Sequence, residues 1–424
     1  MGLLLKGGSV WRQGGFQRCD VRMRNGRIAD MSPSIPCDAD ETVLDVHHCY
    51  IVPGFADVHV HFREPGFSYK ETIETGTAAA ARGGYTAVCT MPNLSPVPDT
   101  PEHLRLELNR IAASARVAVH PYASITLGEA GERLVDFAAL AGQAVAFSDD
   151  GRGVQSRDLM RRAMRAAKAA GGMIVAHCED NALLRGGYIH DGVYAKRHGH
   201  RGICSESEWG PLQRDLELVR ETGCAYHACH LSCAESIELI RKAKADGLPV
   251  TCETAPHYLI LCDEDLQEEG RFKMNPPLRS RADRDALRRG LLDGAVDMIA
   301  TDHAPHSAEE KSKGLAGSAM GVVGLECAFP VLYTALVQPG LLTLERLLEL
   351  LCAAPRARFG LGGGAIEIGE AADLTVLDLS RPFTIDPARF LSKGRSTPFA
   401  GRQVYGAVRL TVYQDSIVWK EPTL

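Results

Sequence analysis

The sequence predicts an α/β protein: a TIM-like (β/α)8 barrel with a small β-sandwich domain formed by both termini. Three observations support this fold class. Short apolar runs alternate with helical patterns through the middle of the chain, eight such runs are present, and the two ends instead carry strand-like pieces separated by turns. Strands that alternate with helices indicate a parallel sheet, and eight strand–helix units are the content of a closed barrel.

The eight strand candidates are short and apolar. They lie at residues 55–60, 85–91, 117–124, 144–148, 173–177, 225–230, 249–255 and 297–301. Between them run segments with apolar residues at helical spacing that end at glycine, which is a common helix stop signal. The alternative is a doubly wound open sheet, which usually carries a glycine-rich turn after its first strand. Here the first strand runs into HFREPG, so the barrel is favoured.

The change of pattern along the chain also predicts the domains. The predicted units are a barrel over residues 55–361 and a β domain that combines residues 1–54 with residues 362–424. Within the β domain, the Asn25-Gly26 pair is typical of a hairpin turn. Residues 185–210 and 307–324 are predicted to be long barrel loops, which are often functional.

The composition is that of an ordinary globular protein and excludes several classes. Of 424 residues, 45% are hydrophobic and 24% are charged, which argues against a disordered chain, a fibrous repeat or a coiled coil. The net charge is −6 without a basic stripe, so we expect no nucleic-acid partner. No apolar stretch approaches the roughly 20 residues that cross a bilayer, so we expect no membrane association. The 13 cysteines lack the paired spacing of a disulfide framework or zinc ribbon, which predicts a reducing, cytoplasmic location.

Six residues at the ends of predicted strands are candidate metal ligands. His59 and His61 lie two positions apart on the first strand, so their imidazoles point to the same face. Aspartates follow the fourth and eighth strands and histidines end the fifth and sixth; these residues are Asp150, Asp302, His177 and His230. The carboxyl ends of barrel strands converge on one mouth. Four imidazoles and two carboxylates form a zinc-type ligand set, enough for two metals if one carboxylate bridges them.

Simpler roles are assigned to neighbouring residues. An aspartate after a strand often caps the next helix, and we expect this role for Asp149. A second histidine pair, His198 and His200, lies in a polar loop and is a weaker metal candidate. The histidines that lie off the strand-end pattern are expected to be structural or to support the ligands, and these are His120, His227 and His257.

Longer motifs carry a family resemblance. The segments GFADVHVHFREPG, ARGGYTAVCTMPN, AFSDDG, VAHCED, KMNPPLR and IATDHAPH occur in this order along nearly the whole chain. Together they resemble the dihydroorotases of the cyclic amidohydrolase superfamily. The likeness is greatest to the bacterial type in which an aspartate, rather than a carboxylated lysine, bridges two zinc ions. The AVAFSDDG segment contains no lysine, which argues against the dihydropyrimidinases and hydantoinases, because these resemble the same scaffold but use a lysine there.

The resemblance implies a zinc-dependent, reversible hydrolysis of the ring amide of dihydroorotate to N-carbamoyl-L-aspartate, a step of pyrimidine biosynthesis. It implies two Zn²⁺ per chain, with Asp150 shared between them. The first zinc is implied to lie on His59, His61, Asp150 and Asp302, and the second on Asp150, His177 and His230. The choice of Asp150 over Asp149 rests on the family motif. Asp302 is expected to be the catalytic group that moves the proton, as base and then as acid.

The resemblance also implies a set of substrate contacts. The matching positions are His61, Arg63, Asn93, Asn275, His306, Met320 and Gly321, although the family usually has phenylalanine near position 320. The implied substrate carries a carboxylate, and the guanidinium of Arg63 can bind such a group with two hydrogen bonds. The alternatives are a structural ion pair of Arg63 with Glu64 or another acid, and a purely turn-forming role for Asn275.

Two other functions stay open. One is a related hydantoinase- or dihydropyrimidinase-like cyclic amidohydrolase. The other is a non-catalytic, dihydroorotase-like partner of aspartate transcarbamoylase, which the presence of all six candidate ligands disfavours. The resemblance further implies a homodimer, and it leaves association with aspartate transcarbamoylase open. The ligand types alone permit zinc, cobalt or manganese.

Overall fold

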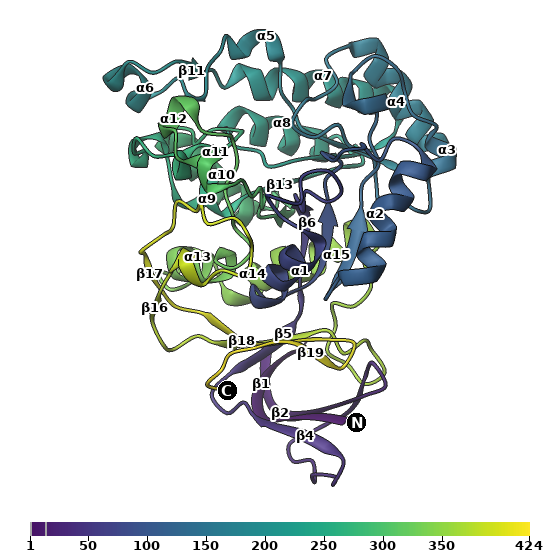
Figure 1. The fold of residues 1–424 in the computed structure, drawn as a ribbon, viewed down its shortest axis with the longest axis vertical. Coiled ribbons are helices and arrows are strands. Elements are labelled where there is room, and N and C mark those ends of the chain that lie inside the picture. Colours follow the sequence, from purple (N-terminus) through teal and green to yellow (C-terminus); the bar gives the residue numbers. More distant parts are fainter. Residues whose placement is uncertain (1, 13–14) are drawn as a thin grey trace.

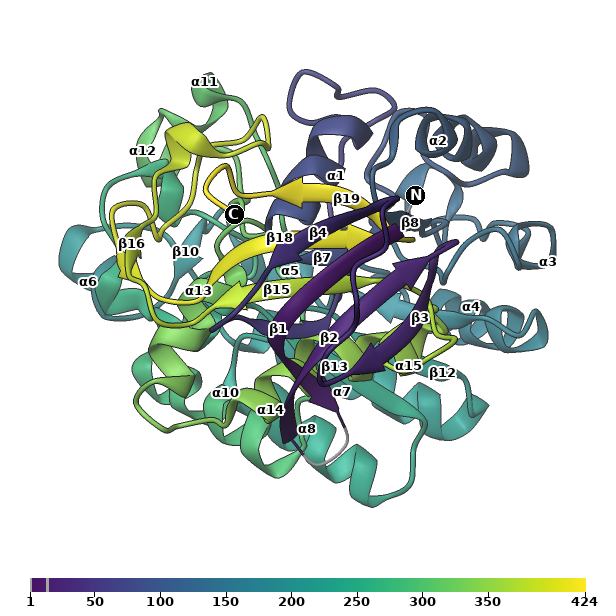
Figure 2. The same ribbon diagram turned by 90° about the horizontal axis from the view of Figure 1, so that it is seen from below.

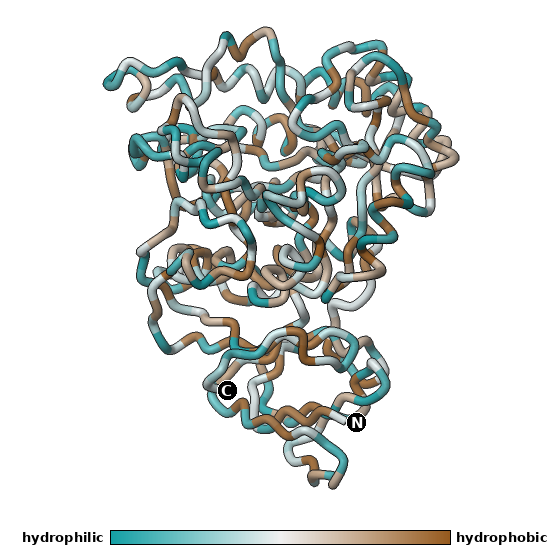
Figure 3. Tube along the Cα trace, in the orientation of Figure 1, coloured by the Kyte–Doolittle hydropathy of each residue, from teal (hydrophilic) through white to brown (hydrophobic). Residues whose placement is uncertain are grey.

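The computed structural model describes residues 2–12 and 15–424, and it confirms the predicted fold class. Figure 1 shows a barrel surrounded by helices, with a smaller β-rich unit below it that contains both chain termini. In Figure 3, hydrophobic residues follow the strands of the small unit and the centre of the barrel. Each unit therefore has an apolar interior of its own, and separate clusters of buried residues fill the two.

Seven of the eight predicted barrel strands form, and all pair in parallel. They are β6 (Phe55–Val60), β7 (Tyr85–Thr90), β8 (Ala118–Pro121), β9 (Met173–Ala176), β12 (Ala225–Ala228), β13 (Val250–Thr254) and β14 (Met298–Ile299). Strands β6 to β8 form one sheet and β9, β12, β13 and β14 form another. The expected strand at 144–148 is not a regular strand, although the backbone N–H groups of Val145 and Phe147 donate to the carbonyls of Pro121, at 2.9 Å, and Met173, at 3.1 Å. Phe147 alone bridges Ala123 on one side and Ile174 on the other, which joins the two sheets.

The barrel closes between its first and last strands through a few short contacts. The backbone N–H of His61 donates to the carbonyl of His303 at 2.8 Å. The carboxylate of Asp57 is completely buried and accepts hydrogen bonds from the backbone of Thr301, at 3.1 and 3.2 Å, and of His59, at 3.0 Å. Burial raises the pKa of Asp57 to about 7, although these hydrogen bonds act to lower it. Asp57 therefore fixes the strand that carries His59 against the strand that precedes Asp302.

Helices cover the outside of the barrel. The long ones are α1 (Ile73–Arg82), α2 (Pro101–Ser114), α4 (Arg157–Ala169), α7 (Glu206–Thr222), α8 (Ala234–Ala245) and α10 (Arg281–Asp293). Four of them begin at hydroxyl side chains that cap free backbone N–H groups, namely Thr72, Thr100, Ser156 and Ser280. Among the residues that the structure describes, no helix combines the length and the apolar character needed to span a bilayer.

Shorter elements fill the loops and the carboxyl-terminal side of the barrel. The loop elements are η1 (Leu127–Glu129), α3 (Phe137–Leu140), α5 (Asn181–Leu184), β10 (Ile189–His190), α6 (Val193–His198), β11 (Gly202–Ile203), α9 (Pro256–Ile260), η2 (Asp263–Asp265), η3 (Gly270–Phe272), α11 (Ala308–Lys311) and α12 (Gly314–Gly317). After the last barrel strand come α13 (Ala328–Leu332), η4 (Tyr333–Val337), α14 (Leu344–Leu348), η5 (Glu349–Ala353), α15 (Ala354–Phe359) and, further on, η6 (Pro387–Arg389). The two predicted long loops are thus partly ordered into short helices and a two-stranded ladder.

Strands from both ends of the chain form one eight-stranded sheet, which Figure 2 shows from below. They are β1 (Gly2–Arg12), β2 (Gly15–Arg24), β3 (Arg27–Ser32), β4 (Glu41–Asp45), β5 (Tyr50–Pro53), β15 (Leu374–Asp378), β18 (Ala407–Tyr413) and β19 (Ser416–Lys420). The antiparallel pair β5–β15 joins the N-terminal strands to the C-terminal ones. A separate short pair, β16 (Phe383–Thr384) and β17 (Gln403–Val404), lies beside it. The exact domain boundaries at 54/55 and 361/362 stay predictions.

Two glycines shape the turns that place these strands. The predicted hairpin turn at Asn25-Gly26 is confirmed, since it links β2 to β3 with positive φ angles of 53° and 75°. Gly54 is the single residue between β5 and β6. A Cβ atom there would lie 2.2 Å from the Thr86 hydroxyl oxygen, so only glycine lets the chain pass this closely from the small unit into the barrel.

Replacing Asp57 tests the closure of the barrel. We expect Asp57→Ala to destabilise the metal-free protein by about 2–5 kcal/mol, because two buried backbone N–H groups lose their acceptor. Urea unfolding followed by circular dichroism measures the difference. The control is Glu132→Ala, which removes an exposed carboxylate and should change stability by less than about 0.5 kcal/mol. Equal stability of the two variants would show that Asp57 does not hold the first and last strands together.

Candidate metal centre and active site

The structure brings all six predicted metal ligands together at the carboxyl ends of the barrel strands, and all six side chains are buried. The carboxylate of Asp150 lies at the centre. Its oxygens are 3.5 Å from Nε2 of His59, 3.6 Å from Nε2 of His61, 3.6 Å from Nδ1 of His177 and 3.5 Å from Nε2 of His230. These distances are too long for good hydrogen bonds. They are close to the roughly 3.3 Å that separates two ligand atoms of one tetrahedral zinc ion.

Asp302 completes the arrangement on one side. Its Oδ1 atom lies 3.1 Å from Nε2 of His61 and 3.6 Å from Nε2 of His59. On the other side, Nδ1 of His177 and Nε2 of His230 approach to 2.9 Å. Among the predicted ligands, two groups of three donors have ligand atoms within 4.8 Å of one another, and they share His59: one with His61 and Asp302, the other with Asp150 and His230.

Unpaired buried atoms show that these residues fit a cation. Within the described part of the chain, Nε2 of His59 and Oδ1 of Asp150 are buried and have no hydrogen-bond partner. An unpaired buried polar atom is costly, so such a pair facing each other indicates a group that binds between them. Burial acts to raise the pKa of Asp302, but the hydrogen bond to His61 and the surrounding imidazoles outweigh it and lower that pKa to about 2. Asp302 is therefore ionised at neutral pH and can act as a ligand or as a base.

Glu253, on β13, orients one of the ligands and was not predicted as a functional residue. Its Oε1 atom accepts a hydrogen bond from Nδ1 of His59 at 2.8 Å, which leaves Nε2 of His59 free to face Asp150. Its Oε2 atom lies 3.2 Å from Nε2 of His227, which agrees with the supporting role expected for His227. Burial acts to raise the pKa of Glu253, but its bonds to both imidazoles lower it to about 2. A charged residue inside the apolar strand VTCET was the signal that could have identified it.

Strained backbone marks the same region. Arg63, His230 and Asp302 have φ angles of 60°, 35° and 47°, in the left-handed region that side chains with a Cβ rarely adopt. Each such residue costs on the order of 1–3 kcal/mol and persists only where the surrounding structure enforces it. All three residues lie two or three positions beyond the end of a barrel strand.

The neighbouring Asp149 does not cap a helix, so that expectation is wrong. Its carboxylate instead accepts hydrogen bonds from the backbone N–H groups of Ile125, at 2.7 Å, and Thr126, at 3.1 Å. It therefore faces away from the imidazoles and holds a neighbouring loop. Asn93 lies on the site side, where its Nδ2 donates to the backbone carbonyl of Asp150 at 2.6 Å.

Arg63 and His306 lie together at the edge of the site. Nε of Arg63 donates to the carbonyl of Pro305 at 3.3 Å, and Arg63 forms no ion pair with any residue that the structure describes. Glu64, the alternative partner, accepts a hydrogen bond from the backbone of Ile73 at 2.9 Å. Arg63 is thus available to an anionic ligand.

The loop at Met320 and Gly321 is held by His306 and by a buried lysine. Nε2 of His306 donates to the carbonyl of Met320 at 2.7 Å, and burial together with the charge of Arg63 lowers the pKa of His306 to about 3, so it is neutral. The ammonium group of Lys311 donates to the carbonyls of Gly321, at 2.6 Å, and Ala319, at 2.7 Å. Sequence reasoning missed Lys311, because nothing in a lysine on a polar loop indicates burial.

The remaining candidates divide between the edge of the site and the outside. Nδ2 of Asn275 donates to Oε1 of Glu179 at 2.7 Å, and the same oxygen lies 3.6 Å from Nε2 of His177. His200, by contrast, contacts Tyr188 within the 185–210 segment and Glu268 outside it, and it belongs to a separate cluster.

Comparisons with known proteins agree with this geometry. The Dihydro-orotase-like family model matches residues 49–236. Proteins named dihydroorotase are similar over nearly the full length: that of Bacillus caldolyticus is 50% identical and the alignment covers 99% of each chain, and that of Anoxybacillus flavithermus (strain DSM 21510 / WK1) is 49% identical over 96% of each. The chain belongs to the dihydroorotase family.

Solved structures extend the family likeness to its fold. The L-hydantoinase (dihydropyrimidinase) from Arthrobacter aurescens is 26% identical, with a TM-score of 0.87 over 99% of this chain and 96% of that one. The dihydropyrimidinase from Brevibacillus agri NCHU1002 is 20% identical, with a TM-score of 0.86 over 99% and 95%. The dihydroorotase family member described here therefore shares its barrel and β-rich unit with these cyclic amidohydrolases.

Metal binding by this family member can be tested without an activity assay. We expect the metal-free protein to bind Co²⁺ with the visible absorption of a site of low symmetry, and to melt at a higher temperature when Zn²⁺ is added. Asp150→Asn should weaken Co²⁺ binding by at least tenfold, because the central carboxylate contacts all four imidazoles. The control Asp158→Asn changes an exposed carboxylate on α4 and should bind like the wild type. Unchanged Co²⁺ binding by Asp150→Asn would refute the central role of Asp150.

Proposed function

We propose that this protein is a dihydroorotase that interconverts dihydroorotate and N-carbamoyl-L-aspartate in pyrimidine biosynthesis, using two Zn²⁺ ions per chain. The observation that carries the proposal is the buried carboxylate of Asp150 at the centre of four imidazoles. Identities of about 50% to proteins named dihydroorotase over the whole length support the same reaction.

The ligand assignment follows the two sides of Asp150. We assign one zinc to His59, His61, Asp150 and Asp302, and the other to Asp150, His177 and His230. Bound zinc would lower the pKa of a water molecule and polarise the amide carbonyl of the substrate. The contribution of Glu253 is to fix the ring of His59 in the tautomer that presents Nε2 to the site.

Asp302 is the residue placed to move the proton. It is ionised at neutral pH and lies at the carboxyl end of the last barrel strand, beside His61. It can accept a proton from the attacking water and deliver it to the ring nitrogen that leaves, which makes it base and then acid in one turnover.

The polar groups around the site are suited to an anionic substrate. The net charge of −6 gives no general attraction, so local cations must provide it. Arg63 is free of ion pairs to the described residues and is placed to bind the substrate carboxylate. We assign further contacts to His61, Asn93, Asn275, His306 and the loop at Met320 and Gly321.

A related activity on dihydropyrimidines or hydantoins is the second candidate, because the hydantoinases share the fold. The identities favour dihydroorotate, since they reach 50% for dihydroorotases but only 20–26% for these structures. Steady-state assays of the zinc-loaded enzyme with dihydroorotate, dihydrouracil and hydantoin decide between them. Turnover of dihydrouracil without turnover of dihydroorotate would reverse the assignment.

The cellular context belongs to the proposal as well. We propose a homodimer in the cytoplasm, which can associate with aspartate transcarbamoylase. All 13 cysteines lie in the described part of the chain and are free thiols, which supports a reducing compartment. Sedimentation of the purified chain with and without aspartate transcarbamoylase tests both associations.

Substituting Asp302 tests the proton transfer. We expect Asp302→Asn to lower kcat by a factor of about 10²–10⁴, since the amide cannot accept the proton. Zinc content is measured in parallel by atomic absorption. A variant that keeps both metals and near-normal kcat would remove Asp302 from the catalytic role.

Substituting Arg63 tests the recognition of the carboxylate. We expect Arg63→Met to raise KM for dihydroorotate by about tenfold or more, which corresponds to one charge-assisted contact, while the zinc content stays unchanged. The control Arg110→Met changes a largely exposed arginine on α2 and should leave KM unaltered. Loss of zinc from Arg63→Met would mean that Arg63 is structural instead.

A further inference from the structure

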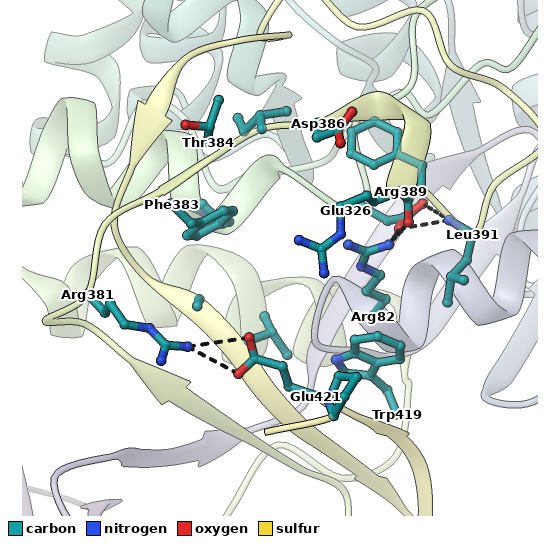
Figure 4. Close-up of a pocket in the computed structure, with 16 residues that line it drawn as sticks. Arg82, Glu326, Arg381, Phe383, Thr384, Asp386, Arg389, Leu391, Trp419 and Glu421 are labelled. Carbon is teal, nitrogen blue, oxygen red and sulfur yellow. Dashed lines mark hydrogen bonds and ion pairs between the residues drawn. The ribbon is translucent and has the colours of Figure 1, made fainter. Parts of the chain in front are cut away.

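A cavity lies where the barrel meets the terminal sheet, and none of its lining residues belongs to the metal centre. Its volume is about 300 Å³, the lower end of the range for small-molecule sites. Arg82 at the end of α1 and Glu326 before α13 form its barrel side, while Trp419 on β19 and the segment 381–391 form the rest. Figure 4 shows these side chains around the cavity.

Arginines and acidic residues line this cavity in equal numbers, with Arg82, Arg381 and Arg389 facing Glu326, Asp386 and Glu421. Nη1 of Arg82 lies 3.1 Å from Oε2 of Glu326, whose side chain is only 2% exposed and also accepts hydrogen bonds from the backbone of Leu391 at 2.8 Å and Ser392 at 3.0 Å. The carboxylate of Glu326 is therefore already engaged by an ion pair and two backbone hydrogen bonds. Arg389 lies near Arg82, and its side chain has no ion-pair or hydrogen-bond partner within the described ranges. Burial lowers the pKa of Arg82, the charge of Glu326 acts to raise it, and the positive charge of Arg389 adds to the lowering.

The second acidic group of the cavity, the carboxylate of Glu421, lies close to two arginines. Nη2 of Arg381 lies 3.5 Å from both carboxylate oxygens of Glu421, and Nε of Arg409 lies 2.5 Å from one of them. The third acid of the cavity, Asp386, accepts a hydrogen bond from the backbone of Ala388 at 3.0 Å. None of these three carboxylates forms an ion pair with Arg389 in the described part of the chain.

Much of the remaining lining is apolar and includes aromatic rings. Phe383, Phe390 and Trp419 contribute aromatic rings, and the guanidinium carbon of Arg82 lies 5.3 Å from the centre of the Trp419 ring. Nε1 of Trp419 is buried and has no hydrogen-bond partner in the described structure. A buried indole N–H normally finds an acceptor, so this atom is an unpaired donor on a residue that lines the cavity.

From these contacts we infer that the cavity binds a small organic anion that combines a flat apolar ring with a phosphate or carboxylate group. The anionic group lies against Arg389 and Arg82, which relieves the repulsion between two neighbouring guanidinium groups. The ring lies between Phe383 and Trp419, and an acceptor atom on the ligand receives the Trp419 N–H. This site is separate from the metal centre, and it does not depend on the proposed reaction.

Phenyl phosphate and benzoate are suitable probes, because each joins one aromatic ring to one anionic group. Calorimetric titration of the zinc-loaded enzyme should give saturable binding, and a change in tryptophan fluorescence should accompany it. Benzyl alcohol, which lacks the charge, and inorganic phosphate, which lacks the ring, should each bind at least tenfold more weakly than the better probe. The better of the two probes identifies the anionic group that the cavity prefers.

Substitutions test whether the probe binds in this cavity. Arg389→Gln should raise the Kd of the better probe by tenfold or more, while Arg197→Gln, a change of an exposed arginine on α6, should leave it unchanged. Trp419→Phe should abolish the fluorescence change, because the signal comes from this ring. Dihydroorotate turnover and melting temperature should match the wild type in all three variants, which confirms folding. Equal affinity of Arg389→Gln and the wild type, or competition between the probe and dihydroorotate, would refute the site.

Discussion

One carboxylate surrounded by four imidazoles is the interaction on which the rest of the site depends. The carboxylates of Asp150, Asp302 and Glu253 are all buried and ionised within one barrel, so without other charges they would repel one another strongly. The imidazoles between them, together with the cations that such a set attracts, are what make this concentration of charge tolerable. Strained φ angles and supporting hydrogen bonds around the barrel mouth keep these donors aimed at a common point.

Much of the fold was predictable because a buried parallel strand and an amphipathic helix each leave a local pattern in the sequence. Both ends of β6 and the Asn25-Gly26 turn were found in this way. The segment 144–148 shows the limit. Its apolar composition indicates a strand, and Phe147 does bridge the strands on both sides, but no regular strand forms. The next residue, Asp149, bonds through its side chain to the backbone of Ile125 and Thr126. Such a tertiary bond leaves no periodic signal.

Some residues of the candidate site could likewise be predicted from the sequence and others could not. The histidines and aspartates at strand ends were predictable, because their chemistry is specific and the barrel fixes where strand ends meet. Glu253 and Lys311 were not, since their roles depend on which atoms they contact: the imidazole of His59 in one case and the carbonyls beside Gly321 in the other. Their importance follows from burial, and burial of a charged side chain is decided by the whole fold.

The passage of the chain through Gly54 has a consequence for how the protein acquires its structure. Strand β5 leads directly into β6, yet its partner β15 lies more than three hundred residues later in the chain. During synthesis the N-terminal strands therefore emerge first, and almost the entire barrel must be synthesised before their sheet can be completed. Pairing over such a sequence separation is intrinsically slow, and the exposed edge of β5 is vulnerable to association with other chains until β15 arrives.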